Sequence, residues 1–363
     1  MLYLISLLSF LLPFQLAIHF NNFQNSVYGF RIDYLIPTIY LTDVVALLII
    51  AFGLKYLKIT KRFVLFSTLY IFFVLLNIYT SDYFISSIYK WLKITELVLL
   101  GIIIFNIKKF DIFKNFLKPL SYSVFVVCLL GIWQFLIRGS IGGIFYWLGE
   151  RSFIFNEPNI APYPYSTFSH PNSFAGFLLV FGIFAAQLRN KFNPRYFWVL
   201  VTLVATNLIL TNSLNVYITA MVILLIKLRN IKALPLFFID LNARYITHRI
   251  ELIKSAFTMI KENFWTGVGL NNFIPNLVKV SNTFINAWEL QPVHNIFLLV
   301  FSEIGIFGFV IFCIFVLSSL TLNNYTLLAV LTTGLSDHYW LTLQQNMLLF
   351  TYVLVITKRY AKK

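Results

Sequence analysis

In Gln291-Pro-Val-His-Asn-Ile-Phe-Leu-Leu-Val-Phe-Ser-Glu-Ile-Gly-Ile-Phe-Gly308, a polar turn leads into a long apolar run. The run continues to about residue 319 and is long enough for a helix that crosses a bilayer, which needs roughly 20 mostly apolar residues. The pair His294-Asn295 therefore stands at the mouth of a predicted membrane helix, where the imidazole meets both water and lipid. Because similar apolar runs recur along the whole chain, the sequence predicts an all-α membrane protein.

The composition agrees with a membrane protein. Apolar residues make up 59% of the 363 residues and charged residues only 11%, roughly half of the charged fraction of a soluble domain. We therefore expect one polytopic membrane domain over residues 1–363, without a separate soluble domain. The two cysteines, Cys128 and Cys313, both lie in apolar runs, so we interpret them as small buried side chains that form neither a disulfide nor a metal site.

Apolar segments of suitable length define the predicted spans. They cover about residues 1–18, 34–54, 63–79, 84–106, 119–137, 172–188, 196–211, 213–226, 233–240, 294–319, 325–335 and 341–357. The segment 1–18 lacks a basic start and a small-residue cleavage site, so we expect a retained helix rather than a signal peptide. The segments 213–226, 233–240 and 325–335 are short for a crossing, and the predicted bundle therefore has about ten to twelve transmembrane helices.

The net charge is +15, and the positions of the basic residues explain this charge without a nucleic-acid partner. Most of the 28 Lys and Arg residues fall in alternate short loops, at residues 55–62, 108–118, 189–195, 227–232 and 358–363. Short, positively charged loops stay on the cytoplasmic side of a membrane. We therefore expect a multi-pass protein with both termini in the cytoplasm and with no nucleic-acid partner.

Two long segments, 138–171 and 241–293, fall on the opposite, outward side in this topology. Connections longer than about 12–15 residues in a compact fold are usually functional or disordered, and these two are too aromatic for disorder. Their aromatic residues include Phe145, Tyr146, Trp147, Tyr163, Tyr165, Trp265 and Trp288. Aromatic side chains at this surface either stack on carbohydrate or form an interfacial belt, and the belt is the more frequent arrangement.

The second outward loop contains a predicted amphipathic helix at residues 244–262. Its apolar side chains recur at helical spacing, at Ile246, Ile250, Ile253, Phe257 and Ile260. Such a helix lies on the membrane surface or on the transmembrane bundle. Arg249 stands three residues after Ile246 and four before Ile253, so its guanidinium is predicted to face the buried side.

An arginine directed inward needs an anionic partner, because burying its charge alone is unfavourable. A phosphate is one candidate, since the planar guanidinium binds phosphate oxygens in pairs. The alternative is a structural ion pair with a carboxylate, for which the candidates are Glu96, Glu303 and Asp337. After the helix, Gly267 and Gly269 either let backbone amides approach an anion or simply form a tight turn.

His294 follows Pro292, which suits the first turn of a helix. The positive end of the helix dipole disfavours a charged imidazole, so this ring should stay neutral and accept a proton from a hydroxyl group. Asn295 is placed to orient the ring or to bind a sugar hydroxyl, and the alternative is a histidine that only caps or anchors the helix start. Glu303 lies half a turn round the helix and is not expected to contact His294.

A second histidine, His170, stands in Ser166-Thr-Phe-Ser-His-Pro-Asn-Ser-Phe-Ala-Gly176. Pro171 and Asn172 mark the entry from a loop into a helix, so on its own this element is more consistent with a structural turn than with catalysis. The remaining histidines, His19, His248 and His338, have no sequence context that assigns them a role.

Three elements follow one another on the predicted outer face: Tyr165–Gly176, the Arg249 helix running into Thr266-Gly-Val-Gly269, and Val293-His-Asn-Ile296 with Glu303-Ile-Gly-Ile-Phe-Gly308. In this order they resemble the O-antigen ligase and polymerase superfamily of bacterial membrane glycosyltransferases. The resemblance covers most of the chain from about residue 120 onward, and the first third agrees only in hydropathy. The His-Asn…Glu-x-Gly-x-x-Gly element is fairly specific when it is combined with the upstream His-Pro-Asn element.

The resemblance implies a function at the outer face of the plasma (inner) membrane. Members transfer a glycan from a polyprenyl (undecaprenyl) pyrophosphate carrier to an acceptor hydroxyl on a glycan or glycolipid, without a nucleotide sugar and, in the ligase branch, without a metal. It implies that His294 activates the acceptor and that Arg249 holds the pyrophosphate. Candidate substrate-binding residues are His170, Asn172, Asn295, Arg151, Gly267 and Gly269. No cofactor is implied, and membrane lipids are expected neighbours.

One position departs from the family pattern. In Thr211-Asn-Ser-Leu-Asn-Val-Tyr217, Leu214 occupies the place where a second arginine usually follows the serine. Either another cation substitutes for this arginine or the pyrophosphate is bound more weakly. The outward-facing candidates for a substitute are Arg151, Lys90 and Lys93.

The sequence leaves two rival functions open. Within the same superfamily, a repeat-unit polysaccharide polymerase applies the same chemistry to a different acceptor. From a different class, a transporter of lipid-linked oligosaccharide carries out no chemistry and is expected to place charged residues along a midplane cavity. Here the buried acidic residues are few (Asp43, Glu96 and Glu303), and the polar residues gather in outward loops. The sequence therefore favours the enzyme.

Overall fold

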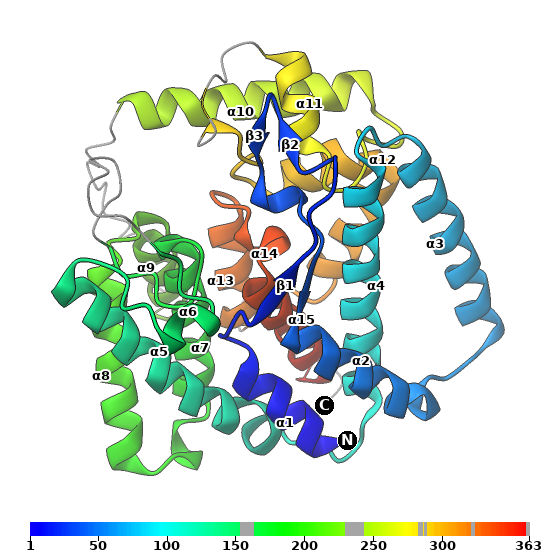
Figure 1. Ribbon diagram of the computed structural model, residues 1–363. Coiled ribbons are helices and arrows are strands. Elements are labelled where there is room, and N and C mark those ends of the chain that lie inside the picture. The colour runs from blue at the N-terminus through cyan, green and yellow to red at the C-terminus, as the bar shows by residue number, and fades with distance from the viewer. Residues whose placement is uncertain (153–162, 229–242, 282–285, 287–288, 321–323, 361–363) are drawn as a thin grey trace.

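The computed structural model describes residues 1–152, 163–228, 243–281, 286, 289–320 and 324–360, and helices dominate these segments (Figure 1). The helices are α1 (Leu2–Leu11), α2 (Leu41–Gly53), α3 (Lys61–Tyr79), α4 (Phe84–Asn106), α5 (Lys118–Ile137), α6 (Ile144–Trp147), α7 (Pro171–Gln187), α8 (Pro194–Leu210), α9 (Leu214–Lys227), α10 (Ala243–Glu262), α11 (Phe273–Val280), α12 (Ile296–Leu317), α13 (Tyr325–Gly334), α14 (Tyr339–Thr342) and α15 (Gln344–Tyr360). Short 3-10 turns cover Asp33–Leu35, Leu54–Tyr56 and Arg189–Lys191, and a π-helical turn, Phe113–Leu117, leads directly into α5. The prediction of an all-α fold is confirmed.

Short antiparallel strands accompany the N-terminal helices. β1 (Ala17–His19) pairs with β4 (Thr38–Tyr40), and β2 (Ser26–Val27) pairs with β3 (Phe30–Arg31). The helices predicted over 1–18 and 34–54 are therefore too long, because α1 ends at Leu11 and α2 begins at Leu41. Pro13 cannot continue a helix, and the β-branched and aromatic residues of β4 suit a strand.

Three helical segments of the described chain are long and apolar enough to cross a membrane by length and composition: α3, the continuous Phe113–Ile137 and α12. The shorter apolar helices are α1, α7, α8, α9 and α13. α4 has 23 residues but carries the charged side chains Lys90, Lys93 and Glu96. The helices agree with a membrane protein, and the predicted span 233–240 lies outside the described residues.

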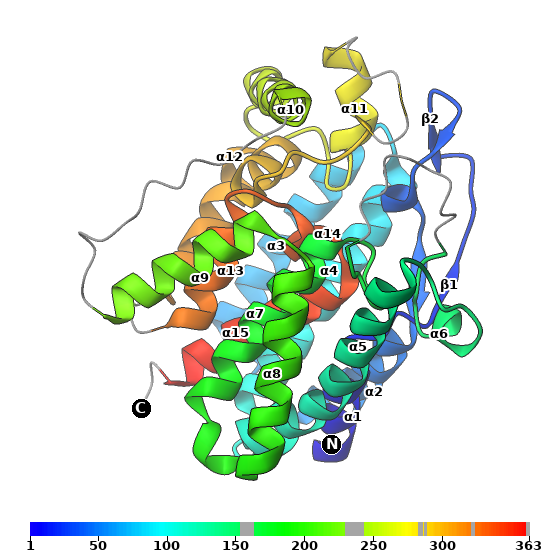
Figure 2. The same ribbon diagram turned by 90° about the vertical axis from the view of Figure 1, so that its left-hand side faces the viewer.

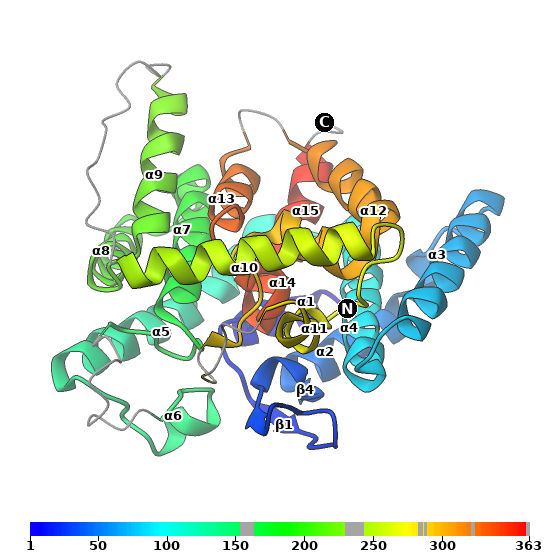
Figure 3. The ribbon, with the colours of Figure 1, turned by 90° about the horizontal axis from the view of Figure 1, so that it is seen from above.

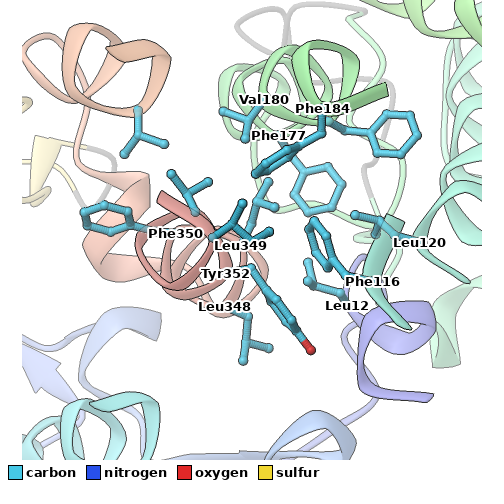
Figure 4. Close-up of a cluster of buried hydrophobic side chains, with 14 of the residues drawn as sticks. Leu12, Phe116, Leu120, Phe177, Val180, Phe184, Leu348, Leu349, Phe350 and Tyr352 are labelled. Carbon is cyan, nitrogen blue, oxygen red and sulfur yellow. The ribbon is translucent and has the colours of Figure 1, made fainter. Parts of the chain in front are cut away.

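The main core lies where α1, α5, α7 and α15 meet (Figure 4). Phe116 stacks on Tyr352 with 4.4 Å between ring centroids, and it meets the ring of Phe184 edge to face at 5.5 Å. The aliphatic side chains around these rings are Leu12, Leu120, Val180, Leu348 and Leu349. Close packing of this kind holds membrane helices together, since lipid provides no hydrophobic driving force between them.

A second layer covers one end of the bundle. α10 lies across this end, and α11 and the β2–β3 hairpin stand beside it (Figure 1, Figure 2 and Figure 3). We call these three elements the cap. The cap core consists of Val27, Ile32, Leu35, Leu252, Ala256, Met259, Val268, Phe273, Ile274, Leu277, Leu290, Val293 and Leu299. It therefore joins α10 to the hairpin, to α11 and to the start of α12.

α10 is amphipathic, but its buried side differs from the predicted one. Its fully buried side chains are Leu252, Ala256 and Met259. Of the predicted stripe, Ile260 is buried, whereas Ile250, Ile253 and Phe257 are exposed. Two apolar stripes lie next to each other on this helix, and residue spacing alone does not show which of them packs. Arg249 precedes Leu252 by three residues, so it stays on the side that faces the bundle, as predicted.

α12 is interrupted at Gly305, whose backbone has φ +62° and ψ −171°, a conformation essentially restricted to glycine. The segment that follows α10 runs along the interruption. The amides of Val268 and Gly269 donate to the carbonyls of Ser302 and Glu303, with N–O distances of 2.9 and 3.0 Å. Backbone hydrogen bonds therefore join the cap to the first half of α12.

Candidate active site

The turn before α12 places His294 at the centre of a polar cluster beneath the cap. Its Nδ1 lies 3.6 Å from Asp337 Oδ1, and its Nε2 lies 3.2 Å from Gln291 Oε1. The His294 side chain is 14% exposed, so it is mostly enclosed and still accessible. One ring nitrogen thus faces a carboxylate oxygen and the other faces the amide oxygen of Gln291, so both nitrogens face hydrogen-bond acceptors.

Asp337 accepts several contacts in this cluster. The backbone amide of His338 donates to Oδ1 at 2.8 Å, and Asn172 Nδ2 donates to Oδ2 at 3.4 Å. Burial by itself would raise the pKa of Asp337, but the contact with His294 and the charge of the neighbouring histidines hold this pKa well below its usual range. The carboxylate therefore stays negative at neutral pH and can stabilise an imidazolium at His294.

His338 packs beside His294 without adding charge. The centroid of its ring lies 5.1 Å from that of His294 and 5.6 Å from that of Tyr34. Its Nδ1 lies 2.8 Å from Thr342 Oγ1. Burial lowers the pKa of His338 to about 3, so this imidazole is neutral at pH 7.

The His-Pro-Asn element reaches the cluster through Asn172. His170 caps α7, because its Nδ1 accepts the amide of Asn172 at 3.1 Å. Pro171 occupies the first helical turn. Amides in this turn have no partner within the helix, so the missing N–H of proline costs no hydrogen bond. The structural turn that the sequence favoured is therefore present, and it brings the Asn172 side chain to Asp337.

Arg249 reaches the cluster from α10. Its Nη1 donates to the backbone carbonyl of Ser336 at 3.1 Å, one residue before Asp337. A guanidinium is positively charged at every physiological pH. The contact therefore places a permanent cation beside the His294–Asp337 pair, although α10, the α13–α14 connection and the turn before α12 are far apart in the sequence.

Asn295 and Arg151 lie at the edge of the cluster. Asn295 caps α12 through Oδ1, which accepts the amides two and three residues ahead at 2.9 and 3.0 Å, and its Nδ2 donates to the carbonyl of Leu335 at 3.0 Å. Asn295 thus anchors the turn that holds His294. Arg151 donates to the carbonyl of Ser169 at 3.2 Å and lies 3.5 Å from the Asp33 carboxylate, with 49% of its side chain exposed.

Gly267 and Gly269 do not line the cluster. Both have positive φ angles, +70° and +98°. The amide of Gly267 donates to the carbonyl of Asn263 at 2.9 Å, and that of Gly269 donates to the carbonyl of Glu303 at 3.0 Å. Because both amides are engaged by carbonyls of the fold, these glycines follow the tight-turn alternative rather than forming an anion cradle.

Leu214 begins α9 close to the cluster. The neighbouring Asn215 donates through Nδ2 to the carbonyl of Thr333 at 3.0 Å, near the end of α13. Of the three candidate substitutes for a cation at Leu214, Arg151 is half exposed at the edge, as described above. The other two, Lys90 and Lys93, are buried inside the bundle, at 8% and 6% exposure.

His294, Asp337 and His338 also form a donor set that a divalent metal accepts. One ligand atom from each lies within 4.8 Å of the other two, and imidazole nitrogens with a carboxylate oxygen are typical ligands of zinc. The contacts already present satisfy much of this set, since His338 Nδ1 is held by Thr342 and both Asp337 oxygens accept hydrogen bonds.

Sequence reasoning does not assign Asp337 or His338 to the site. The available signal is the interruption between two apolar runs, 325–335 and 341–357, where Ser336-Asp337-His338 stands. A titratable pair between two membrane segments indicates a functional site. No feature of the sequence shows that His294 lies next to Asp337 in the fold.

Comparison with known proteins agrees with the predicted family. No curated protein matches the chain. A protein-family model described as O-antigen ligase matches residues 167–313, which include His170, Arg249 and His294. The matched segment contains the elements on which the sequence resemblance was based except Tyr165 and Ser166, and it begins later than the predicted start near residue 120. Asp337 lies beyond its end. Residues 167–313 are therefore similar to the O-antigen ligase family.

Proposed function

We propose that this protein transfers a glycan from a polyprenyl pyrophosphate carrier to an acceptor hydroxyl on the outer side of the plasma membrane. The observation that supports it best is the convergence of His294, Asp337 and Arg249 beneath the cap from three separate segments. An oriented imidazole can act as a general base. A nearby guanidinium can stabilise an anionic leaving group.

In the proposed reaction, the acceptor hydroxyl replaces Gln291 Oε1 at His294 Nε2, and with Nδ1–H directed at Asp337 this nitrogen takes the proton of the hydroxyl. The hydroxyl oxygen forms a bond to the anomeric carbon while the bond from that carbon to the pyrophosphate oxygen breaks, and the configuration inverts. The electron pair leaves with the pyrophosphate, whose developing charge is stabilised by Arg249. Asp337 stabilises the imidazolium through Nδ1, and the departing pyrophosphate or water then removes its proton.

The charge distribution supports an outward-facing site. Both termini lie at the end of the bundle opposite the cap (Figure 1). The loops richest in Lys and Arg were predicted on the same side as the termini, and such loops stay in the cytoplasm. The cap and the polar cluster then face the outer leaflet, where a lipid-linked glycan meets its acceptor.

Purified protein in lipid vesicles should transfer glycan from the polyprenyl pyrophosphate carrier, and saturating EDTA should change the rate by less than about twofold. The physical reason is that the His294–Asp337 pair generates the nucleophile without a metal-bound water. The acceptor found on the product distinguishes a ligase from a repeat-unit polymerase. EDTA inhibition that added zinc reverses would instead assign the cluster to a metal, and glycan that is translocated but never transferred would identify a transporter.

Replacing Asp337 with Asn should lower the transfer rate by about 10²-fold, because the amide keeps the shape of the side chain but no longer stabilises the imidazolium. Initial rates at saturating donor measure this effect. Asp82→Asn is the matched control, because it makes the same change at an exposed carboxylate that pairs with Lys279 outside the cluster, and its rate should stay within about twofold of wild type. A wild-type rate for Asp337→Asn would remove this residue from the mechanism.

A further inference from the structure

α4 carries a buried lysine that has no carboxylate at ion-pair distance among the described residues, although the charge of Glu303 acts on it from further away. Lys90 is 8% exposed, and no carboxylate in the described part of the chain lies within 4.0 Å of its Nζ. Its hydrogen-bond acceptor is Met347 Sδ on α15, at 3.4 Å. A thioether is a weak acceptor, and an ammonium buried without an anion is strongly unfavourable. The position of Lys90 therefore points to an anion that is bound during function.

The other candidate cations are balanced by acidic side chains. Lys93, on the same helix, forms an ion pair with Asp43, which also accepts a hydrogen bond from Gln344 Nε2 at 2.6 Å. Arg151 lies within 3.5 Å of a carboxylate and is half exposed. Three cations were considered as substitutes for the arginine missing at Leu214. Among them, Lys90 is the one that forms no ion pair with a described carboxylate.

Ser87 adds a second donor next to Lys90. It precedes Lys90 by three residues, so the two side chains lie on the same face of α4. The Ser87 Oγ is buried and has no hydrogen-bond partner among the described residues. An ammonium and a hydroxyl on one helix face, both short of partners, form a donor pair that suits phosphate oxygens.

Lys90 lies in the second turn of α4, near the cap. α4 begins at Phe84 directly beneath the cap, where the amide of Tyr83 donates to Asn272 Oδ1 at 2.7 Å. Lys90 is six residues further on, about 9 Å along the helix axis. His294 stands beneath the same cap, in the turn before α12.

We infer that Lys90, together with Ser87, binds the pyrophosphate of the lipid carrier from inside the bundle, while Arg249 binds it from the cap. This inference rests on the proposed function. It assigns to Lys90 the positive charge that the family pattern expects at Leu214. The sugar of the carrier then points toward His294, and its polyprenyl chain extends into the surrounding lipid.

Binding of glycan-free polyprenyl pyrophosphate to the full chain in lipid nanodiscs tests this assignment. Lys90→Gln should weaken binding by about tenfold or more, since a buried charged donor is lost. Lys90→Arg keeps the charge and should bind within about threefold of wild type. Lys279→Gln is the matched control, because it removes an exposed lysine at the same end of the bundle, where Lys279 pairs with Asp82.

Thermal unfolding separates ligand binding from a structural role. The carboxylate of Glu303 accepts the amide of Phe273 at 3.2 Å and is the alternative partner for Lys90. We expect Lys90→Gln to unfold at the same temperature as wild type or higher, because it removes an unbalanced buried charge. Lower unfolding temperatures for both Lys90→Gln and Glu303→Gln, with pyrophosphate binding unchanged, would overturn the assignment.

The same measurements distinguish this inference from the proposed function. If wild type and Lys90→Gln bind polyprenyl pyrophosphate equally well, the role of Lys90 is refuted while the proposed function stands. If binding depends on Lys90 but the wild-type protein transfers no glycan, the binding site stands and the proposed function fails. If wild type does not bind the pyrophosphate at all, both are refuted.

Discussion

Replacing His294 with alanine is expected to lower the rate of glycan transfer by about 10²- to 10⁴-fold, the usual contribution of a general base. The affinity for the lipid-linked donor should change by less than about threefold, because the proposed mechanism gives this imidazole no contact with the pyrophosphate. Single-turnover transfer and donor binding, measured on the same vesicle preparation, check the two expectations. A loss confined to the chemical step is the signature of proton transfer.

His19→Ala is the matched control for this variant. His19 lies in β1, and its Nδ1 lies 2.9 Å from Thr38 Oγ1, outside the polar cluster. Its replacement should leave the transfer rate within about twofold of wild type, since surface substitutions away from a site have small effects. A His294→Ala protein that transfers glycan at the wild-type rate would exclude this histidine as the base.

Replacing Arg249 with alanine should raise the KM for the donor by about 10²-fold and lower kcat as well, because the guanidinium is proposed to bind the pyrophosphate both before and after the bond breaks. Arg249→Lys should restore only part of this loss, since an ammonium keeps the charge but not the planar fork of donors. Steady-state kinetics over a range of donor concentrations separate the effect on KM from the effect on kcat.

Lys254→Ala provides the control on the same helix. Lys254 is exposed and pairs with Glu251 at 2.7 Å, three residues before it. Exposed pairs of this kind contribute little to stability, so this variant should behave as wild type. The structural role of Arg249, through its bond to the carbonyl of Ser336, is monitored by the unfolding temperature. Normal donor kinetics for Arg249→Ala would rule out its proposed function.

Helix positions are the part of the fold that the sequence predicts well. The predicted span 84–106 coincides with α4, and α3 is capped by Thr60, whose Oγ1 accepts the amide of Phe63. α7 and α8 both begin with a proline. Hydropathy, caps and prolines are local signals, so they locate helices without knowledge of their neighbours.

Contacts between distant segments are the part that the sequence does not predict. Asp337 was one of three candidate partners for Arg249, yet its carboxylate lies against His294 and Asn172. The choice depends on how the α13–α14 connection, α7 and the turn before α12 are packed, which residue spacing does not encode. The buried side of α10 illustrates the same limit, because two adjacent apolar stripes have the same helical period.

The glycine at the break of α12 has a consequence for protein engineering. Because Gly305 opens the helix and the segment after α10 supplies amides to the freed carbonyls, the cap and the membrane helix share one hydrogen-bonded backbone. A chimera that exchanged α10 and α11 alone between two relatives would take the donor amides of residues 268 and 269 from one protein and the acceptor carbonyls of residues 302 and 303 from the other. A segment that keeps these backbone donors and acceptors together must therefore include both α10 and the first half of α12, with its own glycine at 305.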